Sequence, residues 1–329
     1  MLRKLPLCLG VMVLLACKPV AAASDVLIEA RNGTDVAKHM EGLGFLDVRK
    51  HPDLLKAVPR FRVPKVPETR VEDWSNDVQL RKSVFIRLGI SAALQANEAL
   101  VADRKRLLGL DLGRLSRADR GWLETLMTQY EVSGEPGSEA LATLKVRVDA
   151  IPVSLAVVQA AIESGWLQSR FAREGQAVFG QWTEGERAIE AKESDARLAA
   201  FDSPHDSLKA YMRNLNTFPA YADFRAARAA LRQAGQPLDG YALAEHLEPY
   251  AETGKEYVAQ IRGMIERENL RPADTAVLIE GPRYIYRHVP EAAAPATAEA
   301  PAAAPAPPLR TGWRRYLPPW PWWSPSGHR

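Results

Sequence analysis

Apolar residues recur at three- and four-residue spacing over most of the chain after residue 74. Residues 84–110 show this pattern over the longest stretch, which predicts one long amphipathic helix. About six further helices are expected, at residues 116–130, 140–148, 154–164, 203–215, 222–233 and 253–269. Strand candidates are confined to a polar segment at 183–199 and to "YIYRHV" near residue 288. The sequence therefore predicts an all-α domain with a small polar lobe.

Residues typical of helix ends punctuate these segments. Ser116 with Asp119 has the spacing of an N-terminal cap, and Thr253 with Glu256 has that of a capping box. Gly165 is well placed to end the helix that starts near residue 154, because glycine readily adopts the left-handed conformation found there.

The first residues have the layout of a secretory signal peptide. Arg3 and Lys4 precede an apolar run over residues 5–16, and small residues follow up to Ala23. This layout predicts cleavage after Ala23. The apolar run is too short to span a bilayer as a stable helix. Lipidation at Cys17 is the alternative, although Leu15 is unusual at its place in a lipoprotein signal. Both alternatives predict export to the periplasm or cell envelope.

The rest of the chain divides by composition. Residues 24–72 show little periodicity and contain several prolines, which predicts an irregular lead-in. An N-terminal helical region at 73–149 and a second helical region at 150–288 follow. An alanine- and proline-rich linker occupies 289–312, because proline at that frequency favours an extended tether.

The tail at 313–329 interleaves tryptophan, proline and arginine. Indole rings favour a membrane interface and arginine favours anionic head groups, so the tail is expected to be disordered and to contact a membrane surface. Folding back onto the domain or binding a partner protein is the alternative.

Charge and cysteine content exclude several classes of function. The net charge is only +3, which gives no basic face for nucleic acid. Both cysteines lie in the first twenty residues and the histidines are scattered. The sequence therefore predicts no metal site and no cofactor.

Glu163 stands at the expected C-terminal end of a helix, directly before Ser-Gly-Trp. That end of a helix carries partial negative charge, and Ile162 and Trp166 remove water from the carboxyl group. Both effects raise the pKa of the glutamate. A raised pKa suits a general acid that protonates a departing glycosidic oxygen. An exposed glutamate without a special role is the alternative from local pattern.

The residues around Glu163 resemble the core motif of bacterial N-acetylglucosaminidase domains, glycoside hydrolase family 73 within the lysozyme-like superfamily. The matching elements are residues 152–154, 159–166, 169–172 and 179–180. Residues 81–110, 201–221 and 243–270 resemble other parts of the Bax-type envelope proteins. The resemblance covers about residues 81–270 and implies a lysozyme-like helical fold with a glucosaminidase domain at 150–288.

By this resemblance Glu163 matches the general acid and Tyr250 the active-site tyrosine of the family. The resemblance also implies a second carboxylate in the polar lobe after residue 180, where Glu186 and then Glu190 are the candidates. The lobe is shorter than the family leads us to expect. A substrate-assisted route would need no second carboxylate.

Several polar and aromatic residues near this motif are candidates for sugar binding. Sugar rings stack on aromatic faces, and amides hydrogen-bond acetamido groups. The candidates are Phe179, Gln181, Trp182, Tyr211 and Asn214, while Trp166 and Phe179 are equally suited to support the core.

The resemblance implies an exported hydrolase that cuts the β-1,4 bond after N-acetylglucosamine in peptidoglycan. Two alternatives stay open. A lytic transglycosylase needs only one acid, and a wall-binding or scaffold protein keeps the groove without turnover.

Overall fold

The computed structural model describes residues 24–62, 77–181, 188–190 and 197–289. The predicted signal peptide with Cys17, the candidates Trp182 and Glu186, nearly all of the linker and the whole tail lie outside the described residues.

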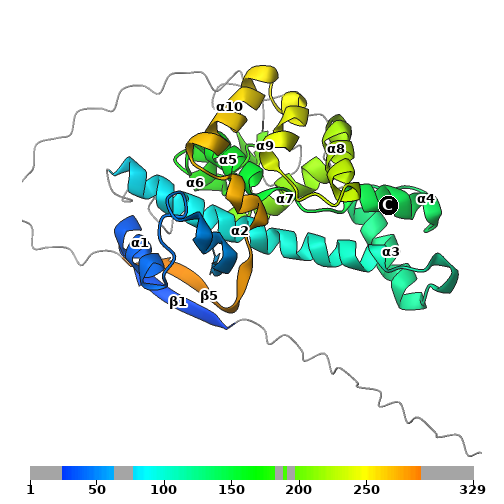
Figure 1. Cartoon of the computed structure of the whole chain (residues 1–329), viewed down its shortest axis with the longest axis horizontal. Coiled ribbons are helices and arrows are strands. Elements are labelled where there is room, and N and C mark those ends of the chain that lie inside the picture. Colours follow the sequence, from blue (N-terminus) through cyan, green and yellow to red (C-terminus); the bar gives the residue numbers. More distant parts are fainter. Residues whose placement is uncertain (1–23, 63–76, 182–187, 191–196, 290–329) are drawn as a thin grey trace, which may run out of the picture.

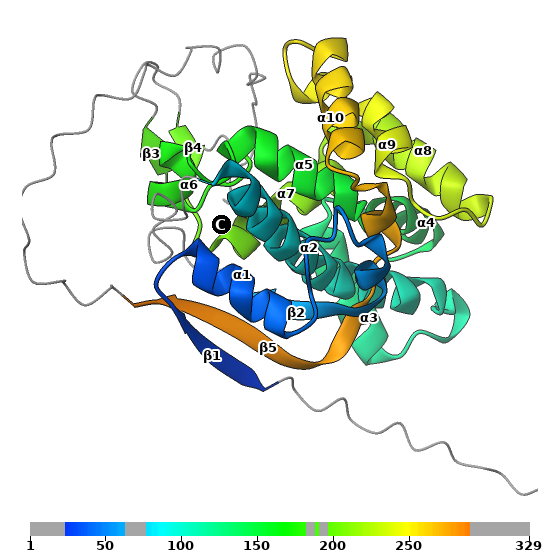
Figure 2. The ribbon, with the colours of Figure 1, turned by 60° about the vertical axis from the view of Figure 1, so that its left-hand side comes forward.

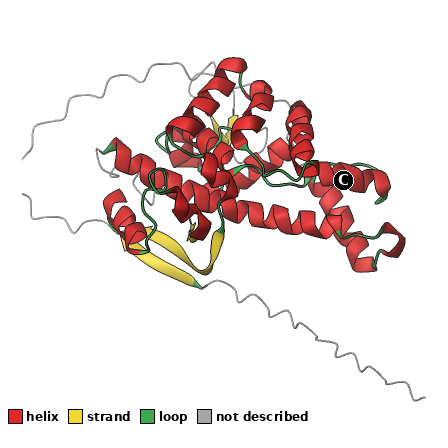
Figure 3. Cartoon of the chain, viewed as in Figure 1, coloured by secondary structure: helices red, strands yellow, loops and turns green. Residues whose placement is uncertain are grey.

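Helices make up most of the described chain, which confirms the mainly helical prediction (Figures 1 and 3). The α-helices are α1 (Gly33–Gly42), α2 (Val78–Leu108), α3 (Arg117–Gln129), α4 (Ser138–Arg147), α5 (Val153–Ser164), α6 (Arg170–Gly175), α7 (Pro204–Thr217), α8 (Ala222–Gln233), α9 (Gly240–Leu243) and α10 (Lys255–Arg267). Short 3₁₀ helices are η1 (Pro52–Ala57), η4 (Leu112–Arg114), η5 (Pro219–Tyr221), η6 (Ala244–Tyr250) and η7 (Arg271–Thr275). The strands are β1 (Asp25–Ala30), β2 (Val58–Arg62), β3 (Ala188–Glu190), β4 (Arg197–Ala199) and β5 (Leu278–His288).

The long helix α2 packs against elements from most parts of the described chain. It begins six residues earlier than the sequence pattern indicates, because Asp77 accepts hydrogen bonds from the amides of Gln79 and Leu80. By length and composition it is the one helix in the described part of the chain that is apolar enough to cross a membrane. However, 61% of its apolar window is buried inside the protein, as expected for a core helix.

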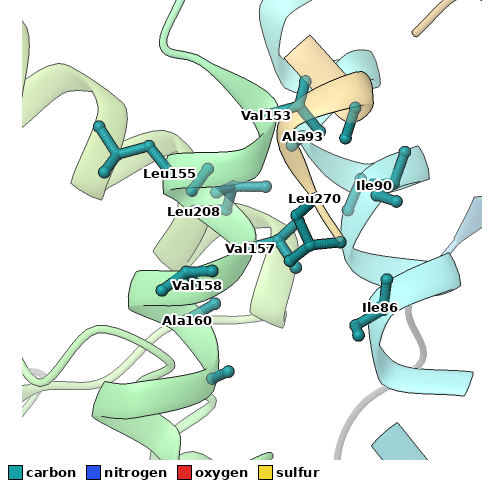
Figure 4. Packing of buried hydrophobic residues seen from close by; sticks show 14 of the residues in the cluster. Ile86, Ile90, Ala93, Val153, Leu155, Val157, Val158, Ala160, Leu208 and Leu270 are labelled. Carbon is teal, nitrogen blue, oxygen red and sulfur yellow. The ribbon is translucent and has the colours of Figure 1, made fainter. Parts of the chain in front are cut away.

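The main core lies between α2 and α5 (Figure 4). Ile86 and Ile90 of α2 face Val153 and Val157 of α5, and Leu270 fills the space between the helices. Eleven of the twelve residues of α5 are buried. Helix α5 is therefore enclosed by the domain, and its position is set by packing on every side.

A second, smaller core joins α3, α4 and the end of α2. Its centre is formed by Leu107, Leu123, Leu126 and Leu144. Figure 1 shows this group of helices at the opposite end of the molecule from β1. The capping of α3 was predicted correctly, since Ser116 Oγ accepts from the amide of Asp119 and donates to its carboxylate.

The irregular lead-in predicted for residues 24–72 is wrong for residues 25–62, which form β1, α1, η1 and β2. Strands β1 and β2 both pair in parallel with β5, giving a three-stranded sheet in the order β1-β5-β2. The expected strand "YIYRHV" is the end of β5, so it belongs to this sheet and not to the second helical region. Figure 2 shows α1 lying on one face of the sheet.

Two other local predictions had different outcomes. The polar lobe contains the antiparallel pair β3–β4 beside α6, as expected (Figure 2). The capping box at Thr253 is wrong, because α10 begins only at Lys255. Gly254 has a φ of +49° and turns the chain before the helix starts, so Thr253 does not occupy the N-cap position.

Candidate active site

Helix α5 presents Glu163 at its C-terminal end, where it is the one residue of the helix that is not buried. The helix ends as predicted at Gly165, which has a left-handed conformation with φ 58° and ψ 44°. The helix does not continue because glycine adopts this conformation without the strain that a side chain would cause.

Glu163 is half-buried as a whole residue, but its carboxyl group is enclosed by protein and receives one hydrogen bond. Its Oε1 atom accepts a hydrogen bond from Tyr257 Oη at 2.7 Å. Burial raises the pKa of Glu163 to about 7, although the hydrogen bond from Tyr257 lowers it. A carboxyl group with that pKa holds its proton in a large fraction of molecules at neutral pH.

A chain of hydrogen bonds continues from Tyr257 into the core. Gln159, one helical turn before Glu163, places Nε2 at 3.0 Å from Tyr257 Oη. The other end of its amide, Oε1, lies 2.5 Å from Tyr211 Oη. The side chains of Tyr211, Gln159 and Tyr257 are all fully buried. Three helices, α5, α7 and α10, therefore meet at this polar chain.

Four tyrosines surround the carboxyl group and form what we call the tyrosine cluster: Tyr211, Tyr221, Tyr250 and Tyr257. Tyr250 and Tyr257 stack with ring centroids 5.4 Å apart, and Tyr250 lies 6.1 Å from Tyr221. Burial raises the pKa of each of these phenols well above its usual range, and the charge of Glu163 adds to that effect. The cluster is therefore uncharged at neutral pH.

The turn after Glu163 has an unusual backbone. Trp166 and Leu167 follow Gly165 with φ values of 61° and 65°, a conformation that costs a non-glycine residue about 1 kcal/mol. Helix α2 holds this turn, since Trp166 packs edge-on against Phe85 at 5.2 Å and lies 4.9 Å from Lys82 Nζ. Trp166 therefore supports the core beside Glu163, which is one of the roles predicted for it.

Tyr250, the tyrosine indicated by the family resemblance, lies in the second layer of the cluster. It is 4% exposed and stacks behind Tyr257. The phenol that hydrogen-bonds Glu163 belongs to Tyr257, which the sequence analysis did not select. A signal was present, because Tyr257, Ile261 and Ile265 recur at helical spacing and all lie on the buried face of α10.

Two of the predicted sugar-binding aromatics are core residues. Phe179 is 3% exposed and stacks on Tyr211 with centroids 4.0 Å apart, and Tyr211 is completely buried. For Phe179 this confirms the core-supporting role that was its alternative, whereas Tyr211, a completely buried residue, does not line an open groove in this structure. The apolar face of α7 turns Tyr211 inward, where its hydroxyl group contacts Gln159.

The polar residues predicted to bind sugar or to act as the base lie in different surroundings. Asn214 is half-buried and lies close enough to Tyr221 to lower the pKa of that phenol, against the larger raising effect of burial. Gln181 is half-buried at the entrance to the lobe, and its Oε1 atom is shielded from solvent with no hydrogen-bond partner among the described residues. Of the two candidate bases, Glu190 ends β3 and Glu186 lies outside the described residues. Their roles stay predictions.

The described residues contain no group of three or more His, Cys, Asp or Glu side chains that could hold a metal ion.

The segment that contains this site is similar to a known family. Residues 139–270 match the glucosaminidase family model, described as mannosyl-glycoprotein endo-beta-N-acetylglucosaminidase. The matched segment includes α5, α7 and α10, and therefore the whole hydrogen-bond chain around Glu163. The curated protein Bax of Escherichia coli is 36% identical over 180 residues, which cover 54% of this chain and 66% of that protein. The match thus spans slightly less than two thirds of this relative.

Two solved structures are also similar. The catalytic domain of the autolysin Auto from Listeria monocytogenes matches with 16% identity, covering 53% of this chain and 96% of its own, with a TM-score of 0.31. A glycoside hydrolase domain of FlgJ from Salmonella typhimurium matches with 23% identity, covering 36% and 84%, with a TM-score of 0.26.

Proposed function

We propose, from the premise that residues 139–270 form a domain of the glucosaminidase family, that the protein is a peptidoglycan hydrolase with Glu163 as its general acid. The bond cut is the β-1,4 bond after N-acetylglucosamine. The observation that carries this proposal is the carboxyl group at the end of α5, with a pKa near 7 and Tyr257 Oη at 2.7 Å.

In the proposed reaction Glu163 donates its proton to the glycosidic oxygen as the bond from that oxygen to the anomeric carbon breaks. A water molecule adds to the anomeric carbon from the opposite face, and its proton passes to a base. The lobe after Gln181 supplies that base in this proposal, with Glu186 as the first candidate and Glu190 as the second. Glu163 then regains a proton from solvent.

The neighbourhood of Glu163 favours this use of the carboxyl group. Within the described chain no Lys, Arg or His hydrogen-bonds Glu163, and the tyrosine cluster is neutral, so no fixed positive charge holds the glutamate ionised. The same buried setting raises the proton affinity of a carboxyl group in glycosidases.

We further propose that the protein works in the cell envelope. The signal-like segment 1–23 carries the export proposal, and Cys17 is the alternative point of lipid attachment. The tryptophan- and arginine-rich tail is proposed to contact a membrane surface. Such a location places the domain beside its proposed substrate.

The test is digestion of purified peptidoglycan with residues 24–329, followed by mass spectrometry of the released ends. New reducing N-acetylglucosamine ends are expected from the wild type. Glu163→Gln, which keeps the shape but has no acidic proton to transfer, should reduce their release by about 10³-fold or more. Glu124→Gln on α3, an exposed position, is the matched control and should retain full activity.

Other products would decide between the alternatives. Anhydro-muramyl ends would identify a lytic transglycosylase that uses the same acid. Binding of both proteins to peptidoglycan without release of any ends would refute the enzymatic proposal and indicate a wall-binding protein. Glu186→Gln and Glu190→Gln, assayed in parallel, would identify the base.

A further inference from the structure

The hydrogen bonds that lead to Glu163 have lengths that define their direction. The contact from Tyr211 Oη to Gln159 Oε1 is 2.5 Å, and the contact from Gln159 Nε2 to Tyr257 Oη is 3.0 Å. A distance near 3.0 Å is typical of N–H···O, whereas 2.5 Å is found for O–H···O and is too short for an amide donor. The amide oxygen of Gln159 therefore faces Tyr211, and its nitrogen faces Tyr257.

This orientation leaves one arrangement of protons. Tyr211 donates to Gln159 Oε1, and Gln159 Nε2 donates to the oxygen of Tyr257. Tyr257 has a single hydroxyl proton, which then points to Glu163 Oε1 at 2.7 Å. Because Glu163 Oε1 accepts this hydrogen bond, it cannot also carry a proton that points towards Tyr257.

We propose that Gln159 and Tyr257 are positioning residues that keep the exchangeable proton of Glu163 on Oε2, the oxygen turned away from the hydrogen-bond chain. Among the described residues, no group hydrogen-bonds Oε2. The proton thus stays on the oxygen that is available to a bound sugar. The catalytic meaning of this arrangement rests on the proposed function, but the placement of the proton does not.

The groups that face Glu163 support this assignment. From α10, α7, η5 and η6 these are the phenols of the tyrosine cluster, each buried and uncharged at neutral pH. Of them, Tyr257 makes the hydrogen bond to the carboxyl group. The direction of that one bond therefore decides which form of Glu163 the chain stabilises.

Two directions of the bond predict opposite shifts. If Tyr257 donates, it stabilises the carboxylate, so its removal in Tyr257→Phe raises the pKa of Glu163. If Tyr257 instead accepts a proton held on Oε1, it stabilises the neutral acid, so the same substitution lowers the pKa. A hydrogen bond to a charged group changes proton affinity about tenfold, which corresponds to a change of about one in the pKa.

The experiment is a ¹³C NMR titration of the Glu163 carboxyl carbon in the full mature chain, with Glu163→Gln used to assign the signal. We expect a pKa near 7 in the wild type and a value about one higher in Tyr257→Phe. A lower value, or an unchanged one, would overturn the proposal. The readout needs no turnover, so it remains decisive if the protein is not a hydrolase.

Two further variants separate the hydrogen-bond chain from general effects on folding. Tyr211→Phe removes the donor that orients Gln159, and the pKa of Glu163 should rise as in Tyr257→Phe. Tyr286→Phe, which removes a buried hydroxyl group bonded to His39 at 3.0 Å in the N-terminal sheet, is the matched control and should leave it unchanged. If Tyr257→Phe fails to fold, Tyr211→Phe provides the test, and no rise in either protein refutes the proposal.

Discussion

At the scale of single residues, the raised pKa of Glu163, about 7, makes its protonation state change near neutral pH. A general acid works only while protonated, so under the proposed function the fraction of active protein declines once the pH passes about 7. We predict that kcat/KM on soluble glycan strands falls about tenfold per pH unit above that point. A pH–rate profile from pH 5 to 9 measures this, and a profile that stays flat to pH 9 would contradict it.

The same residue should make folding depend on pH. Its pKa is raised from 4.5 to about 7 on folding, so its stabilising contribution is complete below pH 4.5 and is lost as the pH rises through 7. Glu163→Gln does not titrate, so it should be more stable than the wild type at pH 8 and similar at pH 4. Allowing for partial exposure, we expect a gain of about 1–2 kcal/mol in the free energy of unfolding at pH 8.

Urea unfolding of both proteins at the two pH values measures this difference. Glu124→Gln is again the control, because its exposed carboxylate should give no gain at either pH. An equal effect of Glu163→Gln at pH 4 and pH 8 would show that packing, and not ionisation, accounts for the change.

At the scale of elements, Asp274 of η7 joins the N-terminal ends of α5 and α9. Its carboxylate accepts from Ser154 N and Ser154 Oγ at 2.8 Å and from Gly240 N at 2.7 Å. The N-cap of α5 is Pro152, which makes no side-chain hydrogen bond, so Asp274 supplies the missing acceptor. Gly240 is required here, because a Cβ would collide with Ser154 Oγ.

We predict that Asp274→Asn destabilises the fold by about 2–3 kcal/mol, since one of its two acceptor atoms becomes an amide donor that faces other donors. Burial raises the pKa of Asp274 to about 6 although these hydrogen bonds lower it, so the comparison belongs at pH 8, where the carboxylate is ionised. Urea midpoints measure the change. Asp223→Asn, at an exposed position in the first turn of α8, should have only a small effect, and equal midpoints for both variants would refute the role of Asp274.

The elements that the sequence predicted are those whose pattern is local. The periodicity of residues 84–110 and the glycine at 165 identified α2 and the end of α5, because both depend on neighbouring residues. Strands β1 and β2 were missed, since each is short and pairs with β5, which lies more than two hundred residues further along the chain. Tyr257 was missed for a related reason: its partner Glu163 is distant in sequence, and Gly254 shifts the start of α10.

At the scale of the whole molecule, β5 connects the two ends of the described chain. It is the central strand of the sheet, and its Tyr286 packs against Phe61 at 6.0 Å and hydrogen-bonds His39. Strands β1 and β2 do not pair with each other, so each depends on β5 for its ladder hydrogen bonds. Arg49 adds a link from the N-terminal segment to Glu268, just after α10, at 3.1 Å.

This arrangement predicts opposite results for two truncations. A protein ending at residue 289 keeps all of β5 and should unfold within about 1 °C of the mature chain, because the described core is complete. A protein ending at residue 277 lacks the central strand and leaves Phe61 without its ring partners Tyr284 and Tyr286, which should cost on the order of 3–5 kcal/mol. Calorimetric melting of the three proteins measures both effects. If the shorter protein had the same melting midpoint as the mature chain, the sheet would not contribute to the stability of the helical core. A lower midpoint would show that the sheet stabilises the unit in which α2 packs against Trp166, next to Glu163.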